Sequence, residues 1–379
     1  MALNSLRPGS RALQSFGRAQ LRSYSHASTP LTSPFAPRHL LSIADLTPSE
    51  LTTLVRSAHS HKLALKSGAV PTSLLNSLTG KVIAMPFSKR STRTRVSTES
   101  AVTTMGGHPM FLGSGDIQLG VNESLYDTSV VISSMTAGIV ARVGPHSDVA
   151  GLAKWSSVPV INALSDEYHP LQTIADYLTI HEAFPSQPSR SSSQITPSLG
   201  LEGMKIAWIG DSNNVLFDLA IGAMKLGINI SVSSPEGYKI PEYMRKIIQS
   251  AATTTDTPGT LTEVSVPEEA IKNADVLVTD TWISMGQEEE SAKRLKAFAG
   301  YQITEEMAKR GGAKEGWKFM HCLPRHQDEV NDAVFYGPRS LVFPEAENRV
   351  YSAISKSTHH LESINSVLIK HSCFGSICG

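Results

Sequence analysis

The stretch from Phe87 to Arg95 brings hydroxyl and cationic side chains together at a predicted strand-to-helix turn. An apolar run over residues 81–87 precedes it, and apolar residues at three-to-four spacing follow it, which indicates a strand, a turn and a helix. The first amides of a helix lack internal partners, and the helix dipole favours anions there. The turn therefore predicts a cradle for a phosphate or carboxyphosphate group. The alternative is a solvated basic turn before a surface helix. The G-x-x-x-x-G-K-[ST] sequence of a P-loop does not occur. The hydroxyls and cations of the turn are Lys89, Arg90, Ser91, Thr92, Arg93, Thr94 and Arg95.

Other polar residues follow neighbouring predicted strands in the same half of the chain. Arg142 comes after an apolar run that starts at residue 139, and His169 and Gln172 follow the run at 158–162. Ligands of parallel sheets bind beyond the carboxyl ends of the strands, so these side chains are expected to converge on the anion cradle. A histidine before a proline is more often a cap or a packing residue, and that alternative stays open.

The second half of the chain repeats this arrangement with different chemistry. Asn214 follows a predicted strand over residues 205–209, and Asp280 follows one over residues 276–279. A carboxylate there suits an ammonium group, and Ser284 with the backbone at Met285 is expected to form a loop over it. The G-x-G-x-x-G fingerprint of a dinucleotide turn does not occur, and Asn214 could also simply cap the next helix.

Cys322 stands at the end of the last predicted strand, in the sequence His321-Cys322-Leu323-Pro324-Arg325. Its cationic neighbours in sequence favour a thiolate, whereas the alternative is an inert core residue. Three cysteines in the whole chain do not make a disulfide framework.

Short apolar runs alternate with helical patterns in both halves, which predicts an α/β fold with two doubly wound parallel-sheet domains, a cleft between them and long connecting helices. The predicted strands are 81–87, 109–112, 139–143, 158–162, 205–209, 229–232, 261–266, 276–279 and 317–320. The predicted helices are 48–68, 92–105, 123–135, 147–155, 169–183, 214–226, 241–251, 287–298 and 304–310.

The composition excludes some classes of partner. Residues 1–44 contain five arginines and no acid, which leaves 29 basic residues against 34 acidic ones elsewhere. A mildly acidic body argues against nucleic acid, and no apolar run approaches the ~20 residues that cross a membrane. The arginines at 7, 11, 18 and 22 lie on one side of a helix, as in a mitochondrial transit peptide.

These patterns divide the chain into six segments. Residues 1–36 are a transit peptide, 37–184 an anion-binding domain and 185–199 a low-complexity linker. Residues 200–343 form the second domain, 344–370 a helix that packs back on the first domain, and 371–379 a tail.

Six motifs, taken together and in this order, resemble the ornithine branch of the transcarbamylase family over roughly residues 40 to 370. The motifs are Ser91–Arg95, Arg142, His169–Gln172, Asp280–Gly286, His321–Arg325 and Pro344–Arg349. The resemblance implies transfer of a carbamoyl group from carbamoyl phosphate to the δ-amine of L-ornithine in the mitochondrial matrix. It also implies homotrimers with shared active sites and no cofactor or metal.

The resemblance assigns a role to each site residue. Carbamoyl phosphate would contact Ser91, Thr92, Arg93, Thr94, Arg142, His169, Gln172, Cys322, Leu323 and Arg349, with Gln118 reaching it from a neighbouring subunit. Ornithine would contact Asn214, Asp280, Ser284 and Met285. Cys322, Asp280, Arg142 and His169 would take part in the chemistry.

Two other functions remain open from the sequence. One is a transcarbamylase with another acceptor, such as putrescine, which lacks the α-carboxylate and α-amine of ornithine. The other is a nucleotide-binding dehydrogenase or a non-catalytic module of the same architecture.

Overall fold

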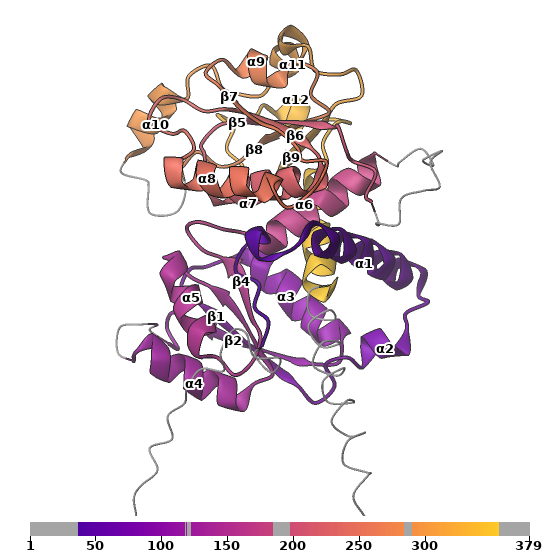
Figure 1. Cartoon of the computed structure of the whole chain (residues 1–379), viewed down its shortest axis with the longest axis vertical. Coiled ribbons are helices and arrows are strands. Elements are labelled where there is room, and N and C mark those ends of the chain that lie inside the picture. Colours follow the sequence, from indigo (N-terminus) through magenta and orange to yellow (C-terminus); the bar gives the residue numbers. More distant parts are fainter. Residues whose placement is uncertain (1–36, 118, 120–122, 185–197, 284–289, 356–379) are drawn as a thin grey trace, which may run out of the picture.

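The chain folds into two lobes, as a computed structural model of residues 37–117, 119, 123–184, 198–283 and 290–355 shows (Figure 1). The lower lobe in the figure is built on a four-stranded parallel sheet, and the upper lobe on a five-stranded parallel sheet. The predicted α/β class with two doubly wound sheets is therefore confirmed. Within the described residues, no helix is both long and apolar enough to cross a lipid bilayer.

The first sheet has the strand order β2-β1-β3-β4, and helices cover both of its faces. Along β1, Ile83 and Met85 pack into the core on one side with α3, while Ala84 packs on the other side with α4 and α5. This alternation follows from the twofold period of a strand, and it requires apolar residues on both faces. The elements of this lobe are η1 (Ile43–Asp45), α1 (Pro48–Ser67), α2 (Thr72–Leu75), β1 (Val82–Phe87), α3 (Thr92–Thr104), β2 (His108–Gly113), α4 (Leu125–Met135), β3 (Gly138–Arg142), α5 (His146–Trp155), β4 (Val160–Leu164) and α6 (Pro170–Ala183).

The second sheet has the order β7-β6-β5-β8-β9 and is covered in the same way. Ile206 and Trp208 of β5 face α7 and α8, whereas Ala207 and Ile209 face α9 and α11. The elements of this lobe are β5 (Lys205–Ile209), α7 (Asn214–Leu226), β6 (Asn229–Ser233), α8 (Glu242–Ala252), β7 (Leu261–Val264), α9 (Pro267–Ile271), β8 (Val276–Thr279), α10 (Ser291–Ala297), α11 (Glu305–Gly311), β9 (Lys318–His321) and α12 (Asp332–Phe335).

The strand order places a ligand-binding crevice in each sheet. The order of the strands reverses between β1 and β3 in the first sheet, and between β5 and β8 in the second. Ligands of such sheets bind outside the carboxyl ends of the strands at these points. The turn at residues 88–95 and Arg142 follow β1 and β3, and Asn214 and Asp280 follow β5 and β8, so the fold positions both predicted groups at switch points.

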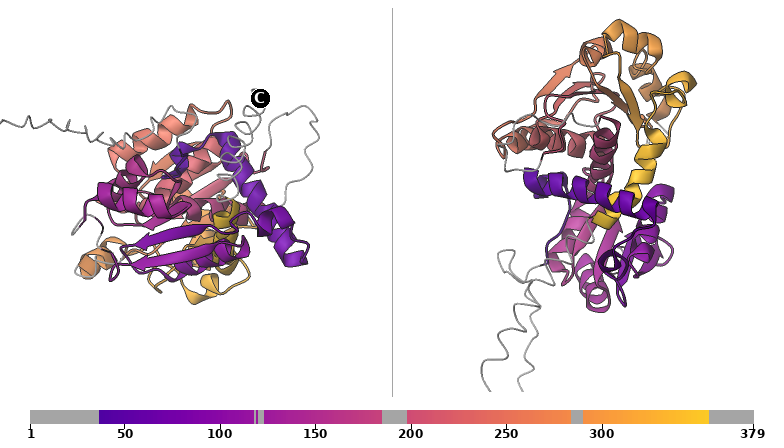
Figure 2. Two further views of the ribbon diagram at one scale, coloured as in Figure 1. Left: turned by 90° about the horizontal axis from the view of Figure 1, so that it is seen from below. Right: turned by 90° about the vertical axis from the view of Figure 1, so that its right-hand side faces the viewer.

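Two helices connect the lobes and bury a common core. Helix α6 and the helix over residues 342–355 pass between the sheets (Figure 2, right). One continuous hydrophobic cluster contains Met85 of the first sheet, Leu178 of α6, Trp208 of the second sheet and Ile354 of the last helix. The lobes therefore share one set of packed side chains.

The segment before α1 also joins the lobes. Leu40 pairs with the edge of β4 through hydrogen bonds with the backbone of Val160 and Asn162, at 2.9 and 2.8 Å. Further on, Asp218 of α7 accepts hydrogen bonds from Ser42 Oγ and from the backbone N–H of Ile43, both at 2.8 Å. The ammonium of Lys225, two turns along α7, donates to the backbone carbonyls at 43, 44 and 46. Residues 40–46 are thus held by one strand of the first lobe and one helix of the second.

Most element boundaries agree with the sequence predictions to within one or two residues. The strand predicted over residues 261–266 is shorter and ends at Val264. Of the helix predicted over 287–298, the described part is α10, which begins at Ser291. Helices α2, α9 and α12 were not predicted. The final helix is described to residue 355, and the rest of the predicted helix, the transit peptide and residues 185–197 lie outside the described residues.

Candidate active site

The turn after β1 is organised by a serine at the start of α3. Ser91 is the N-cap, and its side chain accepts a hydrogen bond from the backbone N–H of Thr94 at 3.3 Å. Serine suits this position because its oxygen replaces the missing partner of an early helix amide. Thr94 is buried, and its hydroxyl lies 3.4 Å from a guanidinium nitrogen of Arg142 and 3.5 Å from one of Arg349. The helix N-terminus and two cations therefore meet at Thr94.

Three cationic or potentially cationic groups surround this point, and none of them forms an ion pair with an acid among the residues that the structure describes. Burial and the neighbouring Arg93 lower the pKa of Arg142 to about 10. Burial also lowers the pKa of Arg349 to about 10. The imidazole of His169 lies 3.3 Å from Arg349, and burial together with the arginines lowers its pKa well below the ordinary value. His169 is therefore neutral, and its Nε2 accepts from Arg349.

Several buried donors around the cradle are not satisfied by the described protein atoms. Within the described part of the chain, Nε of Arg142, Nε of Arg349 and Nδ1 of His169 have no hydrogen-bond partner. Buried polar groups are normally paired, so donors of this kind point to a ligand with acceptor atoms. An oxygen-rich anion would supply those acceptors and would also offset the positive charge.

Gln172 acts one step away from the cavity. Its side-chain oxygen accepts a hydrogen bond from Arg349, and its nitrogen donates to Asp176 at 2.7 Å and to Glu345 at 2.8 Å. The residue is buried and does not line the cavity. Gln172 is therefore in contact with Arg349, a residue that does line the cavity.

The carboxyl ends of β5 and β8 carry the second group of side chains. Asn213, and not Asn214, caps α7: its side-chain oxygen accepts from the backbone N–H groups of Val215 and Leu216. Its nitrogen donates to Asp280 at 2.8 Å. Asn214 lines the cavity and donates to the carbonyl of Ser165 at 2.6 Å, which ties the second lobe to the first.

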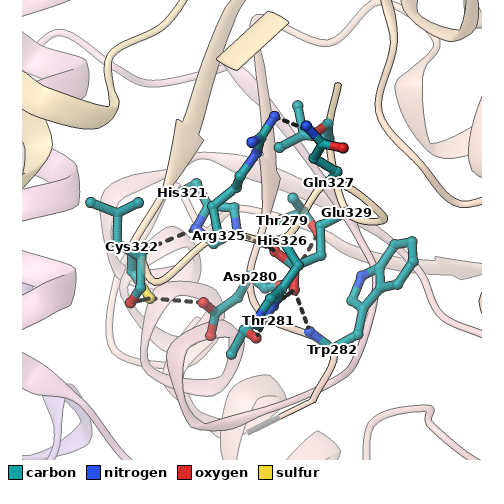
Figure 3. Close-up of polar contacts among 12 residues, drawn as sticks. Thr279, Asp280, Thr281, Trp282, His321, Cys322, Arg325, His326, Gln327 and Glu329 are labelled. Atoms are coloured by element: carbon teal, nitrogen blue, oxygen red, sulfur yellow. Dashed lines mark hydrogen bonds and ion pairs between the residues drawn. The ribbon is translucent and has the colours of Figure 1, made fainter. Parts of the chain in front are cut away.

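The surroundings of Cys322 contradict the sequence expectation of a thiolate. Its Sγ lies 2.9 Å from Oδ1 of Asp280 (Figure 3), and burial and this carboxylate raise the pKa of the thiol well above its ordinary value. The neighbours in sequence do not face the sulfur: His321 bonds to Glu329, and Arg325 to Asp332. Cys322 is therefore a thiol that donates to Asp280.

Both groups of side chains line one cavity of about 1140 Å³. Arg93 of the first lobe donates to the backbone carbonyl of Leu323 in the second, so the two sides are in direct contact. The predicted residues that line this cavity are Ser91, Thr92, Arg93, Thr94, Arg142, His169, Asn214, Asp280, Cys322, Leu323 and Arg349. Gln118, Ser284 and Met285 lie outside the described residues.

Sequence reasoning missed some residues of this cavity. Arg294 is buried, bonds to Asp211 at 2.7 Å and to the carbonyl of Trp282 at 2.8 Å, and stacks over Tyr238. Arg294 stands within α10 and carries no motif of its own. Asp211 carries the one signal in the sequence, since it follows β5 after a single glycine, much as Asp280 follows β8.

Comparison with known proteins agrees with the division of the chain into two lobes. A model for the "Aspartate/ornithine carbamoyltransferase, carbamoyl-P binding domain" matches residues 38–182, and one for the "Asp/Orn binding domain" matches residues 202–355. The mitochondrial ornithine carbamoyltransferase of Emericella nidulans is 67% identical over 338 residues, which are 89% of this chain and 93% of that protein. The mitochondrial enzyme of Schizosaccharomyces pombe is 52% identical over 321 residues, which are 84% and 93% of the two chains.

Solved structures give the same result. The crystal structure of a mitochondrial ornithine carbamoyltransferase from Coccidioides immitis superposes with a TM-score of 0.80 at 62% identity, covering 86% of this chain and 99% of that one. The ornithine carbamoyltransferase from Pyrococcus furiosus superposes with a TM-score of 0.76 at 40% identity, covering 85% and 96%.

Proposed function

The chain belongs to the aspartate/ornithine carbamoyltransferase family, and from this premise we propose the reaction that it catalyses. It is an ornithine carbamoyltransferase: it transfers the carbamoyl group of carbamoyl phosphate to the δ-amine of L-ornithine and yields L-citrulline and phosphate. The names of its relatives support ornithine over putrescine as the acceptor. The same names place the enzyme in mitochondria, in agreement with the arginine-rich segment at residues 7–22.

One observation carries the proposal. A cationic pocket at the switch point of the first sheet and a carboxylate at the switch point of the second line the same cavity, and Arg93 touches Leu323 across it. The first pocket suits a phosphate with a carbonyl attached. The carboxylate of Asp280 suits a primary ammonium. A nucleophilic amine and an activated carbonyl held face to face gain the advantage of proximity.

The anion would occupy the first lobe. The amides at the start of α3, the hydroxyls of Ser91 and Thr92 and the guanidinium of Arg93 would hold its phosphate. Arg142, His169 and Arg349 would surround its carbamoyl end, where their buried donors meet the carbonyl oxygen. Gln172 would contribute by holding Arg349 in place.

The acceptor would occupy the second lobe. The δ-amine of ornithine has a pKa of about 10, as a lysine amine has, so it arrives protonated and must lose a proton before it attacks. Asp280 binds the ammonium, Asn214 contacts the amino-acid end, and Ser284 and Met285 are proposed from the family motif alone. As the new N–C bond forms, Arg142 and His169 stabilise the growing charge on the carbonyl oxygen. The C–O bond to phosphate then breaks.

The structure bears on which group removes the proton. Cys322 is a protonated thiol whose S–H donates a hydrogen bond to Asp280, so it is poorly placed to accept a proton from the amine. We therefore assign Cys322 to orienting Asp280, and the departing phosphate to accepting the proton of the amine. Two protons leave the amine nitrogen overall. The first is lost to solvent when the ammonium becomes the neutral amine, and the second passes after attack to the departing phosphate, which leaves in its monoprotonated form.

We also propose that the enzyme is a homotrimer with active sites shared between chains. Apolar side chains at the surface near the anion turn support an interface there: Val96 of α3 is 56% exposed, and Met110 of the edge strand β2 is 39% exposed. Gln118 follows β2 and is the residue proposed to enter the neighbouring site.

A single assay tests the central proposal. Purified protein is incubated with carbamoyl phosphate and, separately, with L-ornithine, L-aspartate, L-lysine and putrescine. Ureido products are measured colorimetrically, and released phosphate is measured in parallel. Citrulline should form with ornithine, in equal amount to phosphate and with much higher kcat/KM than any other product. Equal or greater turnover with putrescine or aspartate would overturn the assignment of the acceptor.

A further inference from the structure

Glu329 lies outside the cavity, yet it contacts both loops that carry the reactive side chains of the second lobe. Its carboxylate is 1% exposed and accepts four hydrogen bonds (Figure 3). The donors are the backbone N–H of Trp282 at 3.0 Å, Nε2 of His321 at 3.0 Å, and both the backbone N–H and the Nδ1 of His326, at 2.8 and 3.0 Å. These donors lower the pKa of Glu329 despite its burial, so the carboxylate is charged.

The contact with Trp282 fixes the loop after β8. Trp282 stands two residues beyond Asp280, and its ring stacks on Phe298 in the core. Because the backbone N–H of Trp282 is anchored on one side and its ring on the other, the short turn from Thr279 has little freedom. The direction in which Asp280 points is therefore set in part by Glu329.

The contact with His321 fixes the loop after β9. Nδ1 of His321 accepts a hydrogen bond from the backbone N–H of Leu323 at 2.9 Å, so this imidazole must carry its proton on Nε2, which donates to Glu329. Leu323 has a φ of 64°, in the left-handed region that is unfavourable for a residue other than glycine. Such a conformation persists only where surrounding contacts hold it. Here the chain from Glu329 through His321 to Leu323 does so.

The conformation of Leu323 has a direct consequence for the cavity. Its carbonyl accepts from Arg93 of the first lobe, and the preceding residue, Cys322, donates to Asp280. Glu329 thus contacts the loop of Asp280 through Trp282 and the loop of Cys322 through His321. It therefore influences both residues of the Cys322–Asp280 hydrogen bond.

We propose that Glu329 is a positioning residue for carbamoyl transfer, which sets the relative placement of Asp280, Cys322 and the Leu323 carbonyl. It does so by binding Trp282 directly and Leu323 through His321. This inference rests on the proposed function, because its readout is the use of ornithine.

The test compares Glu329→Gln with a matched control, Asp275→Asn, in the full-length enzyme. Asp275 is a largely buried carboxylate of the same lobe that bonds to the backbone of Lys205 and to Lys314, but it precedes β8 and so lies at the end of the strand far from the cavity. Glu329→Gln keeps the size and shape of the side chain, but the amide has one hydrogen-bond acceptor oxygen where the carboxylate has two. It should lower kcat/KM for ornithine by about 10- to 100-fold and raise KM, while the Kd for carbamoyl phosphate changes less than about threefold.

Asp275→Asn should lower the melting temperature without changing either KM. If Glu329→Gln left the KM for ornithine unchanged and only reduced the fraction of active enzyme, Glu329 would have a purely structural role. That result would overturn the proposal. If the wild-type enzyme failed to carbamoylate ornithine at all, the proposed function would fail instead, so the two failures are distinct.

A second pair of variants tests the route through His321. In His321→Asn the side-chain oxygen replaces Nδ1 and still accepts from Leu323, whereas in His321→Gln the amide replaces Nε2 and still reaches Glu329. Each keeps one of the two links, so each should reduce kcat/KM. When either His321 variant is combined with Glu329→Gln, the loss of kcat/KM should be smaller than the product of the two separate losses, because His321 and Glu329 belong to one chain of contacts. Fully multiplicative losses would overturn the route.

Discussion

Asp176 of α6 and Glu345 of the helix over residues 342–355 both accept a hydrogen bond from the side-chain nitrogen of Gln172, at 2.7 and 2.8 Å. Glu345 also accepts from the backbone N–H of His321 at 3.0 Å. The two acids come from the two helices that connect the lobes, and both are fully buried. Burial raises the pKa of Asp176 to about 7 and raises that of Glu345 well above its ordinary value, so the pair holds a proton at neutral pH.

The first prediction concerns stability against pH. An acid whose pKa is higher in the folded than in the unfolded chain holds more protons when folded, so its stabilising effect is present at low pH and is lost as pH rises from about 4 towards 7. Asp176→Asn mimics the protonated acid and should flatten this decline by up to about 1.4 kcal/mol per pH unit. Chemical denaturation at a fixed chain concentration measures it. A slope equal to that of the wild type would contradict the shared proton.

The second prediction concerns the thiol. Burial and Asp280 keep Cys322 protonated, so Cys322→Ser should lower kcat through a weaker hold on Asp280, yet leave the shape of the pH–rate profile between about pH 6 and 9 unchanged. Steady-state kcat measured across this range checks it. Loss of one limb of the profile in the serine variant would restore Cys322 as the base.

The third prediction concerns Asp280. Asp280→Asn removes the charge proposed to bind the ammonium while it keeps the contact with Asn213 possible. The kcat/KM for ornithine should fall by about 10- to 100-fold, because a hydrogen bond to a charged group is lost. The Kd for carbamoyl phosphate, from calorimetric titration without ornithine, should change little. Equal losses for both substrates would place Asp280 outside the acceptor site.

The fourth prediction concerns Arg349. One lysine ammonium cannot reproduce contacts with Thr94, His169 and Gln172 at once, so Arg349→Lys should weaken binding of carbamoyl phosphate by about 10- to 150-fold. Arg310→Lys, at an exposed ion pair with Glu268, is the control and should bind normally. Unaltered affinity in the Arg349 variant would remove this residue from the anion site.

The fifth prediction concerns shared sites. For the proposed trimer, Gln118→Ala and Arg93→Ala should each be nearly inactive when purified separately. When both chains are co-expressed in equal amounts, a random mixture should contain about a quarter of sites with both native residues, so activity should return. Activity no greater than that of the separate variants would mean that each chain completes its own site.

The sequence was informative where the physical signal is local. Strands β5 and β8 and helix α7 have the predicted bounds, because an apolar run or a helical period defines them and a polar turn ends them. Helices α2, α9 and α12 have four or five residues, too few to show a period, and tertiary packing stabilises them.

The site was predictable as a set of strand ends but not in its detailed contacts. Asn213 and Asn214 are equivalent as caps in the sequence, and the position at which α7 starts decides between them. The charge environment of Cys322 was mispredicted because His321 and Arg325 adjoin it in sequence, while Asp280 adjoins it in space. Glu329 does not stand at the end of a strand. Its proposed role depends on two loops that are separated in the sequence and lie side by side in the fold.

The contacts of residues 40–46 with β4 and α7 limit how far the amino terminus can be shortened without disturbing the fold. A protease that removed Leu40 and Ser42 would expose the edge of β4 and take donors from Asp218, the buried acid that also accepts the backbone N–H of His169 at 2.8 Å. If residues 1–36 are a transit peptide, as we propose, a cut beyond Ser42 would remove the hydrogen bond from Ser42 to Asp218 and would disturb the placement of His169, which Asp218 binds through its backbone N–H.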